Sequence, residues 1–244
     1  MNTVIIQARL TSTRLPKKIL RKLGNISVLD HVLMRVKRSK YFKNIVVAVP
    51  NGQENEIKNN IVSKQVDFFS GSENDVLNRF YKCAKKNKSK VICRITSDCP
   101  LIDWRIIDAS YERFKDLGGK CYVANTCPPP SKFPDGMDVE IFPFSMLDTA
   151  NKKETDKSFR EHVTFQFWKK SEYASYLINS KEDYSDLRLT LDYELDFNNL
   201  SKFINEFCPN GEDLSMDEII SIIKKNNTLD FFRNSELRNK GWYK

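Results

Sequence analysis

The chain lacks the long apolar runs and the histidines that several classes of protein require. No apolar run approaches the roughly 18 residues of a membrane span, and the start, MNTVIIQARL, carries no basic leader or small-residue cleavage site. The two histidines, His31 and His162, are too few for a three-histidine zinc site. We therefore expect a soluble, cytoplasmic protein with no membrane partner. A bound metal is expected to be a hard ion held by carboxylates, which favours Mg²⁺.

Paired cysteines and the common nucleotide-binding motifs are also absent. The six cysteines show no CxxC spacing, and we expect reduced thiols, several of them buried. Neither a Walker P-loop nor the GxGxxG of dinucleotide folds occurs. These absences exclude a disulfide framework, a P-loop enzyme and a dinucleotide-binding protein.

The composition is that of a folded domain. The 244 residues are 40% hydrophobic, 11% aromatic and 30% charged, which excludes a disordered chain. The net charge is +8, but it comes mostly from scattered lysines without interleaved aromatics, so we expect a solvated lysine-rich face and no nucleic-acid partner. We predict one domain over residues 1–225 and a polar C-terminal tail over residues 226–244.

Short apolar runs alternate with amphipathic helical patterns in the first half of the chain. We predict strands at residues 3–8, 45–49, 66–69, 91–95 and 121–124, with helices at 28–38, 53–63, from 74 and at 105–117. This alternation predicts an α/β fold, a three-layer structure with a mostly parallel twisted sheet.

The pattern changes at a proline-rich loop, residues 127–135, which we interpret as the rim of an active site. Further strands are predicted at residues 139–142, 174–178 and 188–191, and a helix at 159–168. Two amphipathic helices with apolar residues from 200 to 207 and from 216 to 223 complete the domain.

Two loops at strand ends carry residues suited to phosphate chemistry. The loop over residues 9–18 holds two arginines, two lysines and three hydroxyls, which either cradle phosphate oxygens or form a solvent-exposed basic turn. Asp98 follows a buried strand and Asp192 ends another, so the pair could hold one Mg²⁺. A plain turn residue is the alternative for Asp98, and Asp103 is expected to cap the next helix.

Five segments in order give the chain a family resemblance. They are IIQARLTSTRLPKKIL, FSGSENDVLNRFY, RITSDCPLID, FPDGMDVEIF with REHVT, and LRLTLDYELDF. The chain resembles the CMP-sugar synthetase group of cytidylyltransferases, and more narrowly the SpsF-type spore-coat polysaccharide biosynthesis nucleotidyltransferases. The resemblance implies a nucleotide-diphospho-sugar transferase (Rossmann-like) fold with a small β-containing insertion around residues 125–180.

The resemblance also implies roles for individual residues. Catalysis is expected from Arg14, Lys18 and Asp98, and metal binding from Asp98 and Asp192. The positions expected to bind the nucleotide are Ala8, Arg9, Leu10, Arg14, Lys18, Ser72, Asp75, Arg79 and Thr96. The positions expected to face the acceptor are Asp135, Asp138, Glu140, Arg160, Glu161 and His162.

Several of these positions have alternatives. His162 could be a packed helix residue, and Glu140 a strand residue paired with a neighbouring lysine. Thr11 and Lys17 stand where the family often has glycine, which restricts the backbone there. Cys99 could act as a nucleophile, but packing is the better interpretation because neither histidine is near in sequence.

The resemblance implies a Mg²⁺-dependent cytidylyltransferase that joins CTP to a sugar acid or phosphorylated sugar-like acceptor for a surface glycan, and releases pyrophosphate. The alternatives are a nucleotide-sugar-dependent glycosyltransferase, a non-catalytic nucleotide-sensing module, and a nucleotidyltransferase that uses UTP or GTP. A homodimer formed through residues 125–180 is also implied.

Overall fold

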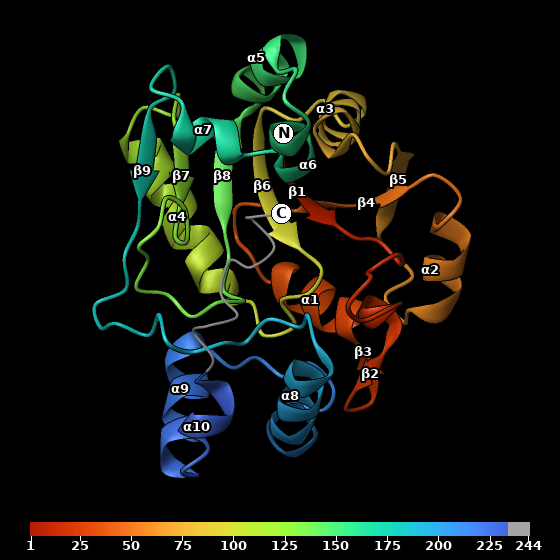
Figure 1. Ribbon diagram of the computed structural model, residues 1–244, viewed down its shortest axis with the longest axis vertical. Coiled ribbons are helices and arrows are strands. Elements are labelled where there is room, and N and C mark those ends of the chain that lie inside the picture. The colour runs from red at the N-terminus through yellow and green to blue at the C-terminus, as the bar shows by residue number, and fades with distance from the viewer. Residues whose placement is uncertain (234–244) are drawn as a thin grey trace.

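The computed structural model describes residues 1–233 of the chain. Its main sheet has the strand order β5-β4-β1-β6-β8-β7-β9 (Figure 1). The strands of this sheet are β1 (Asn2–Gln7), β4 (Asn44–Pro50), β5 (Asp67–Gly71), β6 (Val91–Thr96), β7 (Tyr122–Ala124), β8 (Glu140–Pro143) and β9 (Ser175–Leu177). All neighbouring pairs are parallel except the two that β8 makes with β6 and β7. The predicted α/β fold with a mostly parallel sheet is confirmed.

Helices cover both faces of the sheet. Their bounds are α1 (Val28–Val36), α2 (Glu54–Asn60), α3 (Val76–Lys86), α4 (Trp104–Asp116), α5 (Phe144–Lys153), α6 (Lys157–His162), α7 (Phe165–Lys169), α8 (Glu194–Phe207), α9 (Met216–Lys225) and α10 (Leu229–Phe232). Val4 and Ile6 of β1 pack in one apolar cluster with residues of α1 and α4, while Ile5 packs in a second cluster with residues of α3 and α5. This alternation along one strand produces the three layers.

Several helices begin at a polar residue whose side chain caps the first turn. Ser27 accepts a hydrogen bond from the backbone N–H of Asp30 at the start of α1. Asp103 accepts one from the backbone N–H of Arg105, so its predicted role as the cap of α4 is confirmed. No helix among residues 1–233 is long and apolar enough to cross a membrane.

The strand predicted at residues 188–191 is wrong, because this segment does not join the sheet. Its backbone bonds to a loop instead: Leu189 donates to the carbonyl of Asp135 at 2.6 Å. Leu189 and Leu191 are fully buried all the same, so burial alone explains the apolar run. Gly136 permits the approach, since its φ is +101° and a Cβ there would lie 2.5 Å from the backbone of Leu189.

Two other predictions need correction. The helix predicted at 159–168 is broken at Val163, whose φ of 59° ends α6 and separates it from α7. The tail predicted from residue 226 begins with α10, whose Phe232 is buried. Residues 234–244 of that predicted tail lie outside the described residues. Neither α5 nor the short hairpin of β2 (Lys22–Leu23) and β3 (Ile26–Ser27) was predicted from the sequence.

Candidate active site

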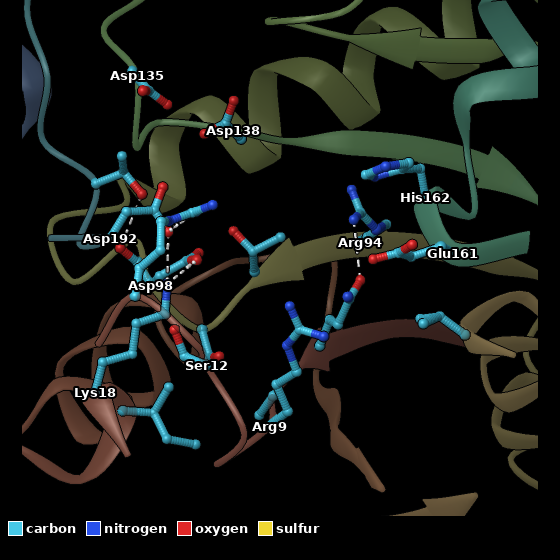
Figure 2. A pocket seen from close by; sticks show the side chains of 18 of the residues that line it. Arg9, Ser12, Lys18, Arg94, Asp98, Asp135, Asp138, Glu161, His162 and Asp192 are labelled. Carbon is cyan, nitrogen blue, oxygen red and sulfur yellow. Dashed lines mark hydrogen bonds and ion pairs between the residues drawn. The ribbon is translucent and has the colours of Figure 1, made fainter. Parts of the chain in front are cut away.

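A pocket of about 270 Å³ opens beyond the carboxyl ends of β1 and β6, where parallel sheets commonly bind ligands. Figure 2 shows the side chains of 18 of the residues that line it. Thirteen of the predicted site residues are among them: Ala8, Arg9, Arg14, Lys18, Arg79, Thr96, Asp98, Asp135, Asp138, Glu140, Glu161, His162 and Asp192. The tertiary structure therefore brings most of the predicted residues together.

Lys18 joins the two predicted metal-binding aspartates. Its ammonium lies 2.8 Å from a carboxylate oxygen of Asp98 and 2.9 Å from one of Asp192, and it also donates to the carbonyl of Leu191 at 2.7 Å (Figure 2). Burial lowers the pKa of the Lys18 ammonium, but the two carboxylates outweigh it and raise the pKa above its usual value. Lys18 is therefore a fixed positive charge between two carboxylates.

The backbone before Lys18 places it there. Lys17 has a φ of 52° and a ψ of 24°, and the short 3₁₀ helix η1 (Lys18–Leu20) follows directly. This left-handed conformation is one that glycine adopts readily, so Lys17 occupies it at some cost. The conformation gives a physical reason for the glycine that the family resemblance implies at this position.

Asp192 is surrounded by three cations. Besides Lys18, it pairs with Arg14 at 2.8 Å and with Arg188 at 3.1 Å. Although burial favours the protonated form, Lys18 and Arg14 hold the pKa of Asp192 well below its usual range. Asp192 is therefore ionised at every physiological pH.

The donor set suits a hard divalent cation. Asp98 and Asp192 both contact the Lys18 ammonium, so their oxygens lie close together. Mg²⁺ in phosphate-transfer sites usually takes one or two carboxylates together with phosphate oxygens and water. Within residues 1–233, no group of three or more His, Cys, Asp or Glu side chains could hold a metal alone. Phosphate oxygens would therefore have to complete the coordination of an ion at this pair.

Arg79 is a buried cation at the α3 side of the pocket. It is 1% exposed, and it donates to the backbone carbonyl of Ser72 at 2.5 Å. Its Nε has no hydrogen-bond partner, and its guanidinium forms no ion pair with a carboxylate, among residues 1–233. Burial and the nearby charge of Arg9 lower the pKa of Arg79 to about 10. Such a group favours an incoming hydrogen-bond acceptor.

Four predicted site residues lie outside the lining of the pocket: Leu10, Ser72, Asp75 and Arg160. Asp75 caps α3 and forms an ion pair with Arg160 at 2.8 Å. The hydroxyl of Ser72 accepts a hydrogen bond from the backbone of Asp75. The backbone N–H of Leu10 donates to the side chain of Gln53 at 2.7 Å. The contacts of these four residues therefore hold neighbouring segments of the protein together and do not face the pocket.

Glu140 lines the pocket and belongs to a buried polar network. It accepts hydrogen bonds from Arg94 at 2.7 Å, from Tyr122 at 3.0 Å and from Thr164 at 3.0 Å. Arg94 in turn donates to the side chain of Gln7 at 3.0 Å. Glu140 is thus a strand residue paired with a cation, but the cation is Arg94 and not the neighbouring lysine of the alternative interpretation.

His162 and Cys99 show the packed surroundings that their alternative interpretations describe. The His162 ring stacks on Phe165 with 4.2 Å between centroids, and burial lowers its pKa. The Cys99 thiol is buried, and burial together with Asp98 raises its pKa well above its usual value. A protonated, covered thiol is a poor nucleophile, so the structure favours packing for Cys99.

The predicted acceptor residues divide into two groups. Figure 2 shows Asp135 and Asp138 on the side of Asp98 and Asp192, whereas Glu161 and His162 lie beyond Arg94. Three polar pocket residues were not predicted from the sequence: Gln7, Arg94 and Arg188. They hydrogen-bond one another or the predicted site residues Glu140 and Asp192. The only signal for Arg94 and Arg188 was a charged residue inside an apolar run.

Comparisons with known proteins agree on one enzyme family. The family model described as "Cytidylyltransferase" matches residues 3–236. An uncharacterized protein of Methanocaldococcus jannaschii is 32% identical over 249 residues, covering 98% of this chain and 96% of its own. The spore coat polysaccharide biosynthesis protein SpsF of Bacillus subtilis is 29% identical over 232 residues, covering 91% and 93% of the two chains.

Solved structures show the same fold. A cytidylyltransferase from Leptospira borgpetersenii is similar with a TM-score of 0.87 and 31% identity, covering 96% of this chain and 97% of its own. The CMP:2-keto-3-deoxy-manno-octonic acid synthetase complexed with CTP has a TM-score of 0.64, and the match covers 84% of this chain and 98% of that one. At 12% identity, this second likeness concerns the fold alone.

Proposed function

The chain belongs to the cytidylyltransferase family, and from that premise we propose that it transfers the cytidylyl group of CTP to an oxygen of a sugar acid or phosphorylated sugar-like acceptor. In this reaction the acceptor oxygen bonds to the α-phosphorus of CTP while the bond to the leaving pyrophosphate breaks. The observation that carries the proposal is Lys18 held between Asp98 and Asp192 in a pocket that Arg14 also lines.

Two of the similar proteins support the substrates. One is a synthetase described in complex with CTP, and its name gives a keto-deoxy sugar acid as acceptor. The other is named for spore coat polysaccharide biosynthesis. We extend CTP, a sugar-like acceptor and a place in surface glycan synthesis to this chain on these grounds.

The basic residues of the 9–18 loop would bind the triphosphate. Arg9, Arg14 and Lys18 line one pocket, and Arg14 and Lys18 share Asp192 as a counter-ion. Phosphate oxygens can replace that carboxylate as partners of the two cations. The positive charges would then stabilise the charge that builds up on the leaving pyrophosphate.

Asp98 and Asp192 are the residues that would hold Mg²⁺. When bound, the ion would withdraw charge from the phosphate and favour the deprotonated acceptor oxygen. Asp192 stays ionised because Lys18 and Arg14 lower its pKa, so no proton competes for its oxygens at neutral pH. Asp135 and Asp138 lie on the same side of the pocket, where their oxygens would accept hydrogen bonds from acceptor hydroxyls.

Pyrophosphate release tests the proposal. We would incubate the protein with CTP, UTP, GTP or ATP and a panel of sugar acids and sugar phosphates, with and without Mg²⁺. We expect Mg²⁺-dependent release with CTP and one acceptor class. Turnover of UTP or GTP alone would change the nucleotide, and reaction only with nucleotide sugars would favour a glycosyltransferase. Light scattering in the same buffer tests the homodimer that the family resemblance implies.

A further inference from the structure

Arg188 is a buried arginine that touches three carboxylates. Its side chain is 3% exposed. It donates to Asp135 at 2.5 Å, to Asp192 at 3.1 Å, and to both oxygens of Asp196 at 2.9 and 3.0 Å. Removing a guanidinium from water is costly unless it is fully paired, so this site is built around the charge.

The contacts of Arg188 hold Asp192 from two directions. Arg188 donates to the Asp192 oxygen that Lys18 and Arg14 do not use. Asp196, the other partner of Arg188, accepts hydrogen bonds from the backbone N–H of Asp192 at 2.8 Å and of Tyr193 at 2.9 Å. Arg188 therefore holds the side chain of Asp192 directly and its backbone through Asp196.

Arg188 also connects Asp192 to the acceptor side of the pocket. Asp135 lies in the loop that precedes Asp138, and its backbone N–H donates to the carbonyl of Leu187 at 3.0 Å. Its carboxylate meets Arg188 at 2.5 Å. The Arg188 guanidinium thus contacts both Asp135, in the loop proposed to face the acceptor, and Asp192, the carboxylate proposed to face the metal and phosphates.

We propose that Arg188 is a positioning residue that fixes the carboxylate of Asp192 toward Lys18 and, through Asp135, makes its position depend on the acceptor-side loop. This inference rests on the proposed function, because it gives Asp192 a role in binding Mg²⁺ and nucleotide. Groups that hydrogen-bond a metal ligand commonly change metal affinity or activity 10- to 100-fold when they are removed.

The test measures thermal stabilisation by CTP as Mg²⁺ is titrated. Arg188→Lys keeps the positive charge but loses the fork that contacts three carboxylates at once. We expect the Mg²⁺ concentration for half-maximal stabilisation to rise about 10-fold or more, with the stabilisation by CTP in EDTA unchanged. Asp135→Asn, which removes the negative charge that Arg188 meets in the loop, should raise it in the same direction by a smaller factor.

Arg105→Lys is the matched control, because Arg105 also pairs with aspartates, Asp103 and Asp213, but lies outside the pocket. It should leave the Mg²⁺ dependence as in the wild type. A purely structural role for Arg188 would weaken CTP binding equally with and without Mg²⁺, and that result would overturn the inference. If Arg188→Lys does not fold, an unchanged Mg²⁺ dependence in Asp135→Asn would overturn it as well.

Failure of the proposed function gives a different result. If the wild-type protein shows no stabilisation by CTP at any Mg²⁺ concentration, both proposals fall. If the wild type responds and Arg188→Lys responds identically, only the role of Arg188 falls.

Discussion

Lys18 and Asp192 lie 174 positions apart in the chain, yet the ammonium of one is 2.9 Å from a carboxylate oxygen of the other. Asp98 meets the same ammonium at 2.8 Å. The contact joins the loop after the first strand to the segment that follows Leu191. Lys18 therefore carries the positive charge that links the two segments within the pocket.

Replacing Lys18 by methionine should lower the rate of pyrophosphate release by about 100-fold or more, the size seen when one charge-stabilising contact is removed from an active site. Lys17→Met is the matched control, because Lys17 is the neighbouring lysine and pairs with the exposed Glu56. Turnover of Lys18→Met at the wild-type rate, with the control also active, would contradict the assignment.

Replacing Arg79 by methionine should have opposite effects on stability and on binding. Without ligand, the melting temperature should stay the same or rise, because a buried guanidinium without a carboxylate partner costs free energy. The rise in melting temperature with saturating CTP, about 5–10 °C for a ligand at 100 times its dissociation constant, should shrink. Differential scanning fluorimetry measures both. A full CTP shift in Arg79→Met would show that this arginine does not contact the nucleotide.

Replacing Cys99 by alanine should leave activity within about threefold of the wild type, because the thiol is buried and its pKa is raised. Iodoacetamide should likewise fail to inactivate the native enzyme at neutral pH. Complete loss of turnover in Cys99→Ala with an intact circular dichroism spectrum would instead support a covalent role for the thiol.

Protein stability should fall as the pH is lowered from about 7 to 5. His31 is fully buried, its Nε2 lies 2.7 Å from the carbonyl of Leu23, and burial lowers its pKa. Below a pH of about 6.5, His31 of the unfolded chain therefore binds a proton, whereas His31 of the folded chain stays neutral until a lower pH. The stability is therefore present above that pH and is lost as the pH falls toward the lowered pKa.

Urea unfolding at several pH values measures this slope, and His31→Gln should flatten it. His162 contributes in the same direction, because burial lowers its pKa too. A slope that is unchanged in His31→Gln would assign the pH dependence to His162 or to other groups.

The local sequence was enough to predict the alternation of strands and helices in the first half, because apolar periodicity records which faces are buried. Asp103 as a helix cap followed from the same kind of local chemistry. The loops that carry Arg14, Lys18 and Asp98 were expected to meet, since loops at the carboxyl ends of parallel strands lie at one edge, and these residues do line one pocket.

Only the tertiary structure decided how those residues pair. Leu189 and Leu191 read as a strand but pack in the core beside a loop, because an apolar run records burial and not hydrogen-bond partners. Asp75 and Arg160 pair with each other outside the pocket, and Arg188 collects three carboxylates. Ion pairs of this kind join segments distant in the chain, so no local pattern records them. Their geometry follows from the packing that brings the segments together.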